Sequence, residues 1–253
     1  MRQQRRNRME TRKEISQYCK RVAFSQRAVE LCETEASSLQ EYFVHYVMKS
    51  ELENRELAKR KRLLREAAFP VYKTLEGYEF ISQRLPGNLR KEDLKEGSFI
   101  KDRKNIVMYG PVGTGKTHLA IALGTSACEK GIPVKFFTAS ELVVRLSEAF
   151  KSGNLEKMMK SIFKAELLII DEWGYVPIDK QGAQLLFRII SDSYERRSLI
   201  ITTNLEFSRW GALFTDDQMA AAMIDRLAHH GYLVLFEGES YRMKNALMRQ
   251  KSL

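Results

Sequence analysis

The stretch GPVGTGKTH at residues 110–118 decides the fold, because it matches the pattern of a glycine-rich phosphate-binding loop. Such a loop needs a buried strand before it and a helix after it. Residues 105–109, NIVMY, form a short apolar run, and residues 117–131 have the composition of a helix. The sequence therefore predicts a strand, a loop and a helix that together bind nucleotide phosphates.

Each residue type in this loop suits one part of nucleotide binding. The glycines let backbone N–H groups turn toward the phosphates. Lys116 is expected to reach the β- and γ-phosphates of ATP, and the Thr117 hydroxyl is expected to hold Mg²⁺. The predicted nucleotide-binding residues are Gly110, Gly113, Thr114, Gly115, Lys116, Thr117 and His118.

The run LLIIDE at residues 167–172 ends a second apolar strand with two adjacent carboxylates. We expect Asp171 to contact Mg²⁺ directly or through water, and Glu172 to orient and deprotonate the attacking water. Many small-molecule kinases need no such glutamate, because a substrate hydroxyl is their nucleophile. The acidic pair therefore favours hydrolysis.

A third apolar run, SLIITTN at residues 198–204, ends with Asn204. Asparagine at the end of a strand is commonly a turn former. After the two preceding motifs, however, its amide could bridge the γ-phosphate and the attacking water. We therefore count Asn204 as a candidate catalytic residue.

Strands and helices alternate along the chain after residue 100. The run VKFFTA at residues 134–139 reads as a further strand, and helical stretches separate it from the runs on either side. This alternation predicts an α/β domain with a largely parallel sheet.

The N-terminal part has a different character. Residues 12–67 contain no proline or glycine, and apolar residues recur at steps of three and four, which indicates helix. We expect one break, at Ser37-Ser38. The predicted domains are a helical domain at 1–67 and an ATPase core at 68–253, with 68–97 as a joining segment.

The net charge of +10 is concentrated near the N-terminus, where residues 1–75 hold 17 Lys and Arg against 10 Glu and no Asp. Such an excess favours a polyanionic partner, most simply nucleic acid, although a solvated helical surface gives the same composition. No segment spells a base-reading motif, so we expect contacts to DNA phosphates with little sequence preference. The candidate DNA-binding residues are Lys59, Arg60, Lys61, Arg62, Arg65, Lys151, Lys157, Lys160 and Lys164.

Other features of the composition restrict the class of protein. No apolar run is long enough for a membrane span, and no signal-peptide core follows the basic N-terminus, so we expect a cytoplasmic protein. The three cysteines are too few and too scattered to indicate a disulfide framework or a zinc site.

The order of motifs resembles that of the AAA+ ATPases. The stretches GKTHLA, LLIIDEWGYVP, TTN, MIDRL and GESYR resemble in particular the IstB-like helper ATPases of insertion-sequence transposition, which are relatives of DnaC-type helicase loaders and DnaA-type initiators. The resemblance covers about residues 68–245. It implies an AAA+ P-loop NTPase core with a mainly parallel sheet, joined to a small all-α N-terminal domain. Trp173 departs from the leucine common after the acidic pair, and we expect it to serve in packing.

The resemblance also implies two catalytic arginines. Arg226 in MIDRL resembles an arginine finger, which acts on nucleotide bound by the neighbouring subunit, so a homo-oligomer is implied. Arg242 in GESYR resembles a second sensor arginine, which contacts the γ-phosphate in its own subunit. Because only 27 residues follow Arg226, we expect no separate C-terminal lid domain.

The resemblance implies an ATPase that assembles on double-stranded DNA, selects a target site and recruits or activates a transposase. The motifs by themselves indicate only ATP-dependent assembly. Three alternatives stay open: a replicative helicase loader, a nucleotide-switched adaptor that binds protein only, and a small-molecule P-loop kinase.

Overall fold

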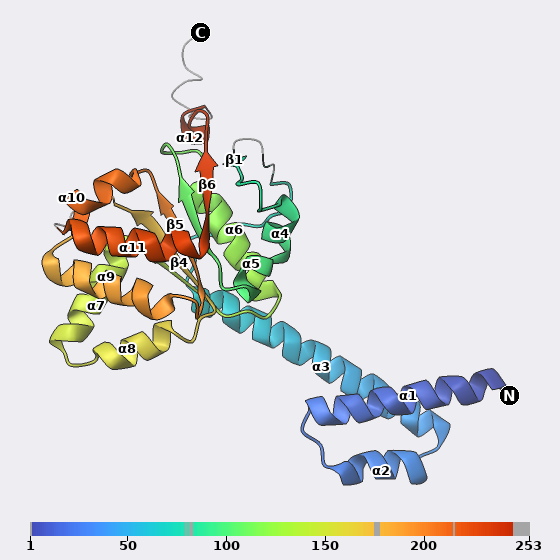
Figure 1. The fold of residues 1–253 in the computed structure, drawn as a ribbon. Coiled ribbons are helices and arrows are strands. Elements are labelled where there is room, and N and C mark those ends of the chain that lie inside the picture. Colours follow the sequence, from blue (N-terminus) through green and yellow to red (C-terminus); the bar gives the residue numbers. More distant parts are fainter. Residues whose placement is uncertain (1, 79, 81–82, 175–177, 215, 245–253) are drawn as a thin grey trace. The chain divides into compact units, whose positions relative to one another are not determined.

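Contacts divide the chain into two units, Met1–Arg62 and Leu63–Leu253. The computed structural model describes residues 2–78, 80, 83–174, 178–214 and 216–244 (Figure 1). The division falls inside a helix, at residue 62. This boundary lies before residue 67, the predicted end of the helical domain, because Leu63 and Ala67 are buried in the core of the second unit.

The first unit has three helices: α1 (Arg2–Arg21), α2 (Gln26–Thr34) and α3 (Ser38–Ala67). The expected break at Ser37-Ser38 is present, but the expectation of a single break was wrong. The chain also turns between α1 and α2, where Ala23 has a φ of 60° and Ser25 precedes the first turn of α2. Because neither proline nor glycine marks this turn, the usual helix-breaking signals did not reveal it.

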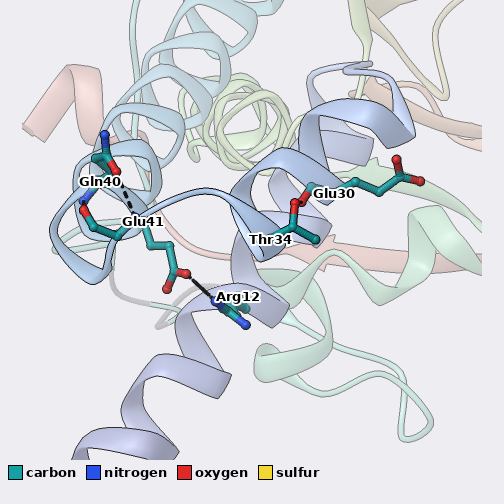
Figure 2. Close-up of polar contacts among 6 residues, drawn as sticks. Arg12, Glu30, Thr34, Gln40 and Glu41 are labelled. Carbon is teal, nitrogen blue, oxygen red and sulfur yellow. Dashed lines mark hydrogen bonds and ion pairs between the residues drawn. The ribbon is translucent and has the colours of Figure 1, made fainter.

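A small core joins these three helices. Ile15 and Cys19 of α1 are buried with Val29 of α2 and Met48 of α3. Beside this core Arg12 donates to the carboxylate of Glu41 at 2.6 Å, as Figure 2 shows. Only 1% of the Glu41 side chain is exposed, and a buried carboxylate requires such a partner. The ion pair therefore connects α1 to α3.

The second unit contains a six-stranded sheet in the order β1-β6-β2-β5-β4-β3. Strands β6, β2, β5, β4 and β3 are parallel, and β1 pairs antiparallel with β6. The predicted α/β class with a mainly parallel sheet is confirmed. The strands are β1 (Gln83–Arg84), β2 (Asn105–Tyr109), β3 (Val134–Thr138), β4 (Leu167–Trp173), β5 (Ser198–Thr203) and β6 (Gly231–Phe236).

Helices cover both faces of this sheet (Figure 1). The helices of this unit, beyond the end of α3, are α4 (Lys91–Glu96), α5 (Ser98–Lys101), α6 (Lys116–Glu129), α7 (Ala139–Lys151), α8 (Leu155–Ile162), α9 (Lys180–Ser193), the 3₁₀ turn η1 (Phe207–Arg209), α10 (Trp210–Phe214), α11 (Asp217–His229) and α12 (Tyr241–Lys244). In β4, Leu167 and Ile169 point to the face covered by α4, α5 and α6, whereas Leu168 and Ile170 point to the face covered by α7 to α11. Burial on both faces explains why the strands are continuous apolar runs.

The joining segment 68–97 contributes to the second unit. It contains β1 and α4, and Phe80 and Leu94 are buried in the same cluster as α6. The sequence did not predict β1, because a strand of two residues has too few positions to show alternation. Among the described residues, no helix combines the length and apolarity that crossing a membrane requires.

The start of β6 lies so close to β2 that a substitution at Gly231 tests how tightly the sheet is packed. A Cβ atom on Gly231 would lie 2.3 Å from the backbone oxygen of Leu227 and 3.0 Å from the Cβ atom of Asn105. Gly231→Ala is therefore expected to lower the free energy of unfolding by about 1–3 kcal/mol through overpacking. Urea denaturation would measure the change. Gly87→Ala is the control because its Cβ would meet nothing within 4 Å, and an equal loss in both variants would contradict the packing account.

Candidate functional site

The phosphate-binding loop lies where β2 ends and α6 begins. Lys116 is the first residue of α6, and its buried ammonium group donates to the carbonyl oxygens of Gly110 and Pro111, both at 2.6 Å. The pKa of Lys116 is lowered to about 8, chiefly by burial. The carboxylate of Asp171 opposes this lowering, and the positive charge of Arg242 contributes to it. The lysine is thus held at the loop, where the surrounding negative charge is too small to compensate for the loss of hydration of its ammonium group.

The carboxylate of Asp171 connects three elements of the site. Asp171 lies in β4 with only 3% of its surface exposed, and its Oδ1 accepts a hydrogen bond from the Thr117 hydroxyl on α6 at 2.9 Å. The same oxygen accepts a hydrogen bond from the hydroxyl of Thr202 on β5. Mg²⁺ in nucleotide sites prefers oxygen ligands and takes only one or two from the protein. The adjacent oxygens of Thr117 and Asp171 therefore fit the expected Mg²⁺ site.

Glu172 follows Asp171 but points elsewhere, because the backbone of β4 is irregular there. The register between β4 and β5 shifts between Ile170 and Trp173, and Glu172 has a φ of 60°. Bulges of this kind re-aim side chains beside active sites. The Glu172 side chain is exposed although its neighbour is buried, so the two acids have different surroundings, as their different expected roles require.

Thr202 is a site residue that the sequence reasoning missed. Its buried hydroxyl donates to Asp171 and accepts the backbone N–H of Glu172 at 3.0 Å. One hydroxyl therefore contacts both acidic residues. The sequence offered only a weak signal, a polar pair at residues 202–203 that ends an apolar strand.

Asn204 follows the last residue of β5 and is exposed at the carboxyl edge of the sheet. The preceding Thr203 accepts the backbone N–H of Gly110 through its carbonyl oxygen at 3.2 Å, and its hydroxyl donates to the Trp173 carbonyl oxygen at 2.7 Å. The end of β5 is thus bonded to both the loop and β4. Trp173 is fully buried against Trp210, which confirms its packing role.

The segment after β6 brings Arg242 to the loop. The backbone N–H of Tyr241 donates to the carbonyl oxygen of Gly113 at 3.0 Å. Gly113 has a φ of 83°, and a Cβ atom there would lie 2.0 Å from the Ser240 hydroxyl oxygen, so this close approach requires glycine. The charge of Arg242 consequently acts on Lys116.

Arg226 has its contacts elsewhere in the same chain. It lies on α11, donates to the carbonyl oxygen of Ala222 at 2.7 Å, and places its guanidinium group 5.1 Å from the ring centre of Phe187 on α9. The charges that act on Lys116 are those of Asp171 and Arg242. Of the two expected arginines, Arg242 adjoins the residue that is hydrogen-bonded to the loop, whereas Arg226 contacts Ala222 and Phe187.

Thr114 and His118 lie at opposite ends of the loop-to-helix turn. The Thr114 hydroxyl donates to the Pro111 carbonyl oxygen at 2.8 Å. The His118 ring lies 5.3 Å from that of Tyr78, and burial together with the charge of Lys73 lowers the His118 pKa. Burial raises the pKa of Tyr78 to about 12, so the phenol stays neutral. The sequence reasoning did not assign Tyr78 to this site.

The expected DNA-binding residues form two exposed groups. Lys59 to Arg62, with Arg65, surround the later turns of α3. Lys157, Lys160 and Lys164 are exposed along α8 and just after it, on the side opposite the buried Met159. Lys151, at the end of α7, lines a groove of about 490 Å³ that also reaches Glu172. Residues 175–177 of the stretch LLIIDEWGYVP lie outside the described residues.

The position of Thr202 leads to a test of its role. Thr202→Val keeps the volume but removes both hydrogen bonds, so Asp171 and Glu172 lose their common support. We expect nucleotide hydrolysis to fall about 10- to 100-fold while nucleotide affinity changes much less. Thr202→Ser should restore the rate, because serine keeps the hydroxyl. Steady-state kinetics and nucleotide titration would measure both quantities, and parental turnover in Thr202→Val would contradict the role.

The lowered pKa of Lys116 predicts that nucleotide binding takes up protons. Phosphate favours the charged ammonium group and should return its pKa toward the ordinary value, so uptake should rise from about 0.1 proton at pH 7 to about 0.9 at pH 9. Calorimetric titration with a non-hydrolysable ATP analogue in buffers of different ionisation enthalpy would measure it. Lys116→Arg is the control, because arginine remains charged and should show almost no uptake. Equal uptake by the parent at both pH values would contradict the prediction.

Comparison with known proteins relates this site to nucleotide-binding relatives. A family described as IstB-like ATP-binding protein matches residues 20–249. The chain is 34% identical over 243 residues to the ATP-binding protein of insertion sequence IS5376 from Geobacillus stearothermophilus, covering 94% of this chain and 96% of the relative. It is 40% identical over 183 residues to the ATP-binding protein of insertion sequence IS21 from Pseudomonas aeruginosa, covering 72% and 68%.

Solved structures with the same fold support the class of the second unit. AMPPCP-bound DnaA from Aquifex aeolicus matches with a TM-score of 0.54 and 23% identity, over 72% of this chain and 54% of that one. A DnaC helicase loader matches with a TM-score of 0.51 and 22% identity, over 65% and 96%. At this identity the likeness shows the fold alone, and it confirms the AAA+ P-loop class. Together with the family match, these findings show that the chain belongs to the IstB-like ATP-binding proteins of insertion sequences.

Proposed function

We propose that this protein is a Mg²⁺-dependent ATP hydrolase that assembles as a homo-oligomer on double-stranded DNA and assists the transposase of its insertion sequence. The observation that carries hydrolysis is the contact between Thr117 and Asp171 beside an exposed Glu172. The insertion-sequence relatives, matched over nearly the whole chain, support a role in transposition. We place this work in the cytoplasm, where the DNA target lies.

In the proposed mechanism each acidic residue has a separate task. Thr117 and Asp171 would hold Mg²⁺, which when bound neutralises charge on the β- and γ-phosphates. Lys116 would contact the same phosphates with its ammonium group. Glu172 would accept a proton from the attacking water, and Asn204, at the same edge of the sheet, would help to orient that water.

The proposed oligomer follows from the two arginines. Arg242, close to Lys116, would contact the γ-phosphate in its own subunit. Arg226 has its contacts on α9 and α11. Because MIDRL resembles the arginine-finger motif, we assign Arg226 to nucleotide bound by a neighbouring subunit. A site completed by the next subunit would couple hydrolysis to assembly, because an isolated subunit would lack part of its transition-state stabilisation.

The exposed lysines of α8 and the basic turns of α3 would contact DNA phosphates. Such contacts bind DNA without reading sequence, and they weaken steeply with salt because bound counterions are released. Nonspecific binding suits a protein that accepts many target sites. In this proposal the protein selects a site by assembling there, and it then recruits or activates the transposase.

The decisive experiment measures binding of the full chain to duplex DNA with ATP, with ADP and without nucleotide, at two salt concentrations, while the particle mass is followed. We expect salt-sensitive growth of the particle only with ATP. Glu172→Gln should retain this assembly but hydrolyse ATP about 10²- to 10⁴-fold more slowly. Lys116→Ala should lose the assembly.

A matched pair of variants tests the α8 contacts. Replacement of Lys157, Lys160 and Lys164 by alanine should reduce the slope of log affinity against log salt by about three, whereas the exposed Lys101→Ala should leave it unchanged. Preference for single-stranded DNA would instead favour a helicase loader. Absence of any salt-sensitive DNA binding would favour a protein adaptor, and phosphate transfer to an acceptor other than water would favour a kinase.

A further inference from the structure

The third helix of the N-terminal unit carries two apolar faces, of which only one is used in the core. Val44 and Met48 face the small core with α1 and α2. A second set, which we call the α3 stripe, remains at the surface with exposed fractions between 46% and 79%. The α3 stripe consists of Leu39, Tyr42, Phe43, Tyr46 and Val47.

The spacing of the α3 stripe shows that its side chains share one side of the helix. Steps of three and four residues place them in adjacent turns, over a length of about 12 Å. Leu31 of α2 lies beside Leu39 and Phe43 in a groove of about 810 Å³ between α2 and α3. Contiguous exposed apolar patches on soluble proteins usually mark interaction sites, and clustered aromatic residues supply much of the binding energy at such sites.

The charges around the α3 stripe are opposite to those of the chain as a whole. Residues 26–56 contain seven glutamates against three lysines and arginines, within a protein of net charge +10. Glu41 is buried against Arg12 and Glu51 pairs with Arg55, whereas Glu30, Glu33 and Glu35, in and just after α2, are exposed. Glu35 lines the groove with 66% of its side chain exposed, and the exposed guanidinium group of Arg27 lies 3.8 Å from its carboxylate. An acidic, apolar surface repels nucleic acid phosphates and complements a positive partner. The basic character of the N-terminal unit therefore belongs to its two ends.

We propose that the α3 stripe is a docking surface for a basic amphipathic helix of a partner protein. A groove between two helices accepts such a helix along its apolar side, with anchors at steps of three and four residues. Lysine and arginine on the flanks of that helix would face Glu35 and the neighbouring glutamates. This goes beyond the function proposed above, because docking here requires neither nucleotide nor DNA.

The test uses the full chain without nucleotide and a labelled amphipathic peptide of about five helical turns, with leucine on one side and lysine on the other. A matched peptide carries glutamate in place of lysine. Fluorescence anisotropy should show binding of the lysine peptide, weakened by salt, and at least about tenfold weaker binding of the glutamate peptide. Equal binding of the two peptides, or binding of neither, would overturn the proposal.

Three variants locate the interaction. Combined Phe43→Ser and Tyr46→Ser should weaken the lysine peptide at least about tenfold, since both side chains act as anchors. Phe150→Ser, at an aromatic residue of α7 that is 53% exposed, should leave the affinity unchanged. Glu35→Lys should weaken the lysine peptide and strengthen the glutamate peptide while the apolar anchors remain. Thermal unfolding would establish that the variants keep their fold.

Other occupants of the α3 stripe give different results. If the parent chain is a dimer that Phe43→Ser and Tyr46→Ser convert to a monomer, the surface belongs to a second copy. If labelled duplex DNA binds the parent chain and combined Phe43→Ser and Tyr46→Ser abolish that binding, nucleic acid is the ligand of the stripe. Either result would overturn the proposal. Loss of ATP hydrolysis or DNA binding in a separate assay would concern the proposed function and would leave the peptide result unaffected.

Discussion

The carboxylate of Asp171 is the point at which the elements of the nucleotide site meet. Its Oδ1 accepts hydrogen bonds from the hydroxyl groups of Thr117 on α6 and Thr202 on β5, while Asp171 itself belongs to β4. A buried carboxylate is stable only when such donors are in place. The relative positions of two parallel strands and the helix after the loop are therefore constrained by the hydrogen bonding of this one side chain.

This constraint also explains how two adjacent acids acquire different surroundings. Asp171 stays buried among hydroxyl groups, and the chain then leaves regular strand geometry, so that Glu172 reaches solvent with a φ of 60°. A left-handed conformation is unfavourable for a residue with a side chain, and structures retain it where the surroundings determine it. Here the hydroxyl of Thr202 accepts the N–H of Glu172, and fully buried Trp173 holds the strand immediately after it.

The N-terminal unit divides its surface between two kinds of chemistry. In the sequence, basic residues are frequent before residue 22, and exposed basic residues lie on the later turns of α3, whereas residues 26–56 have a net negative charge and present the α3 stripe. Long-range attraction to a polyanion and short-range apolar docking can therefore operate on separate parts of one small unit. Two such surfaces would allow the unit to contact DNA and a protein at the same time.

By itself, the sequence determined the class of the second unit and most of its strands. Continuous apolar runs before GPVGTGKTH and before the acidic pair are typical of strands that are covered on both faces of a parallel sheet. The phosphate-binding loop is recognised from its residue types at fixed spacing. It did not reveal the turn at Ala23, the strands β1 and β6 or the role of Thr202. The strands and the role of Thr202 depend on contacts between residues far apart in the chain, whereas the turn at Ala23 is closed by local hydrogen bonds without a glycine or proline to mark it. Only the tertiary structure placed Thr202 between the two acids and brought Arg242 to Lys116. It also left one apolar side of α3 exposed. All three features depend on which elements pack against each other.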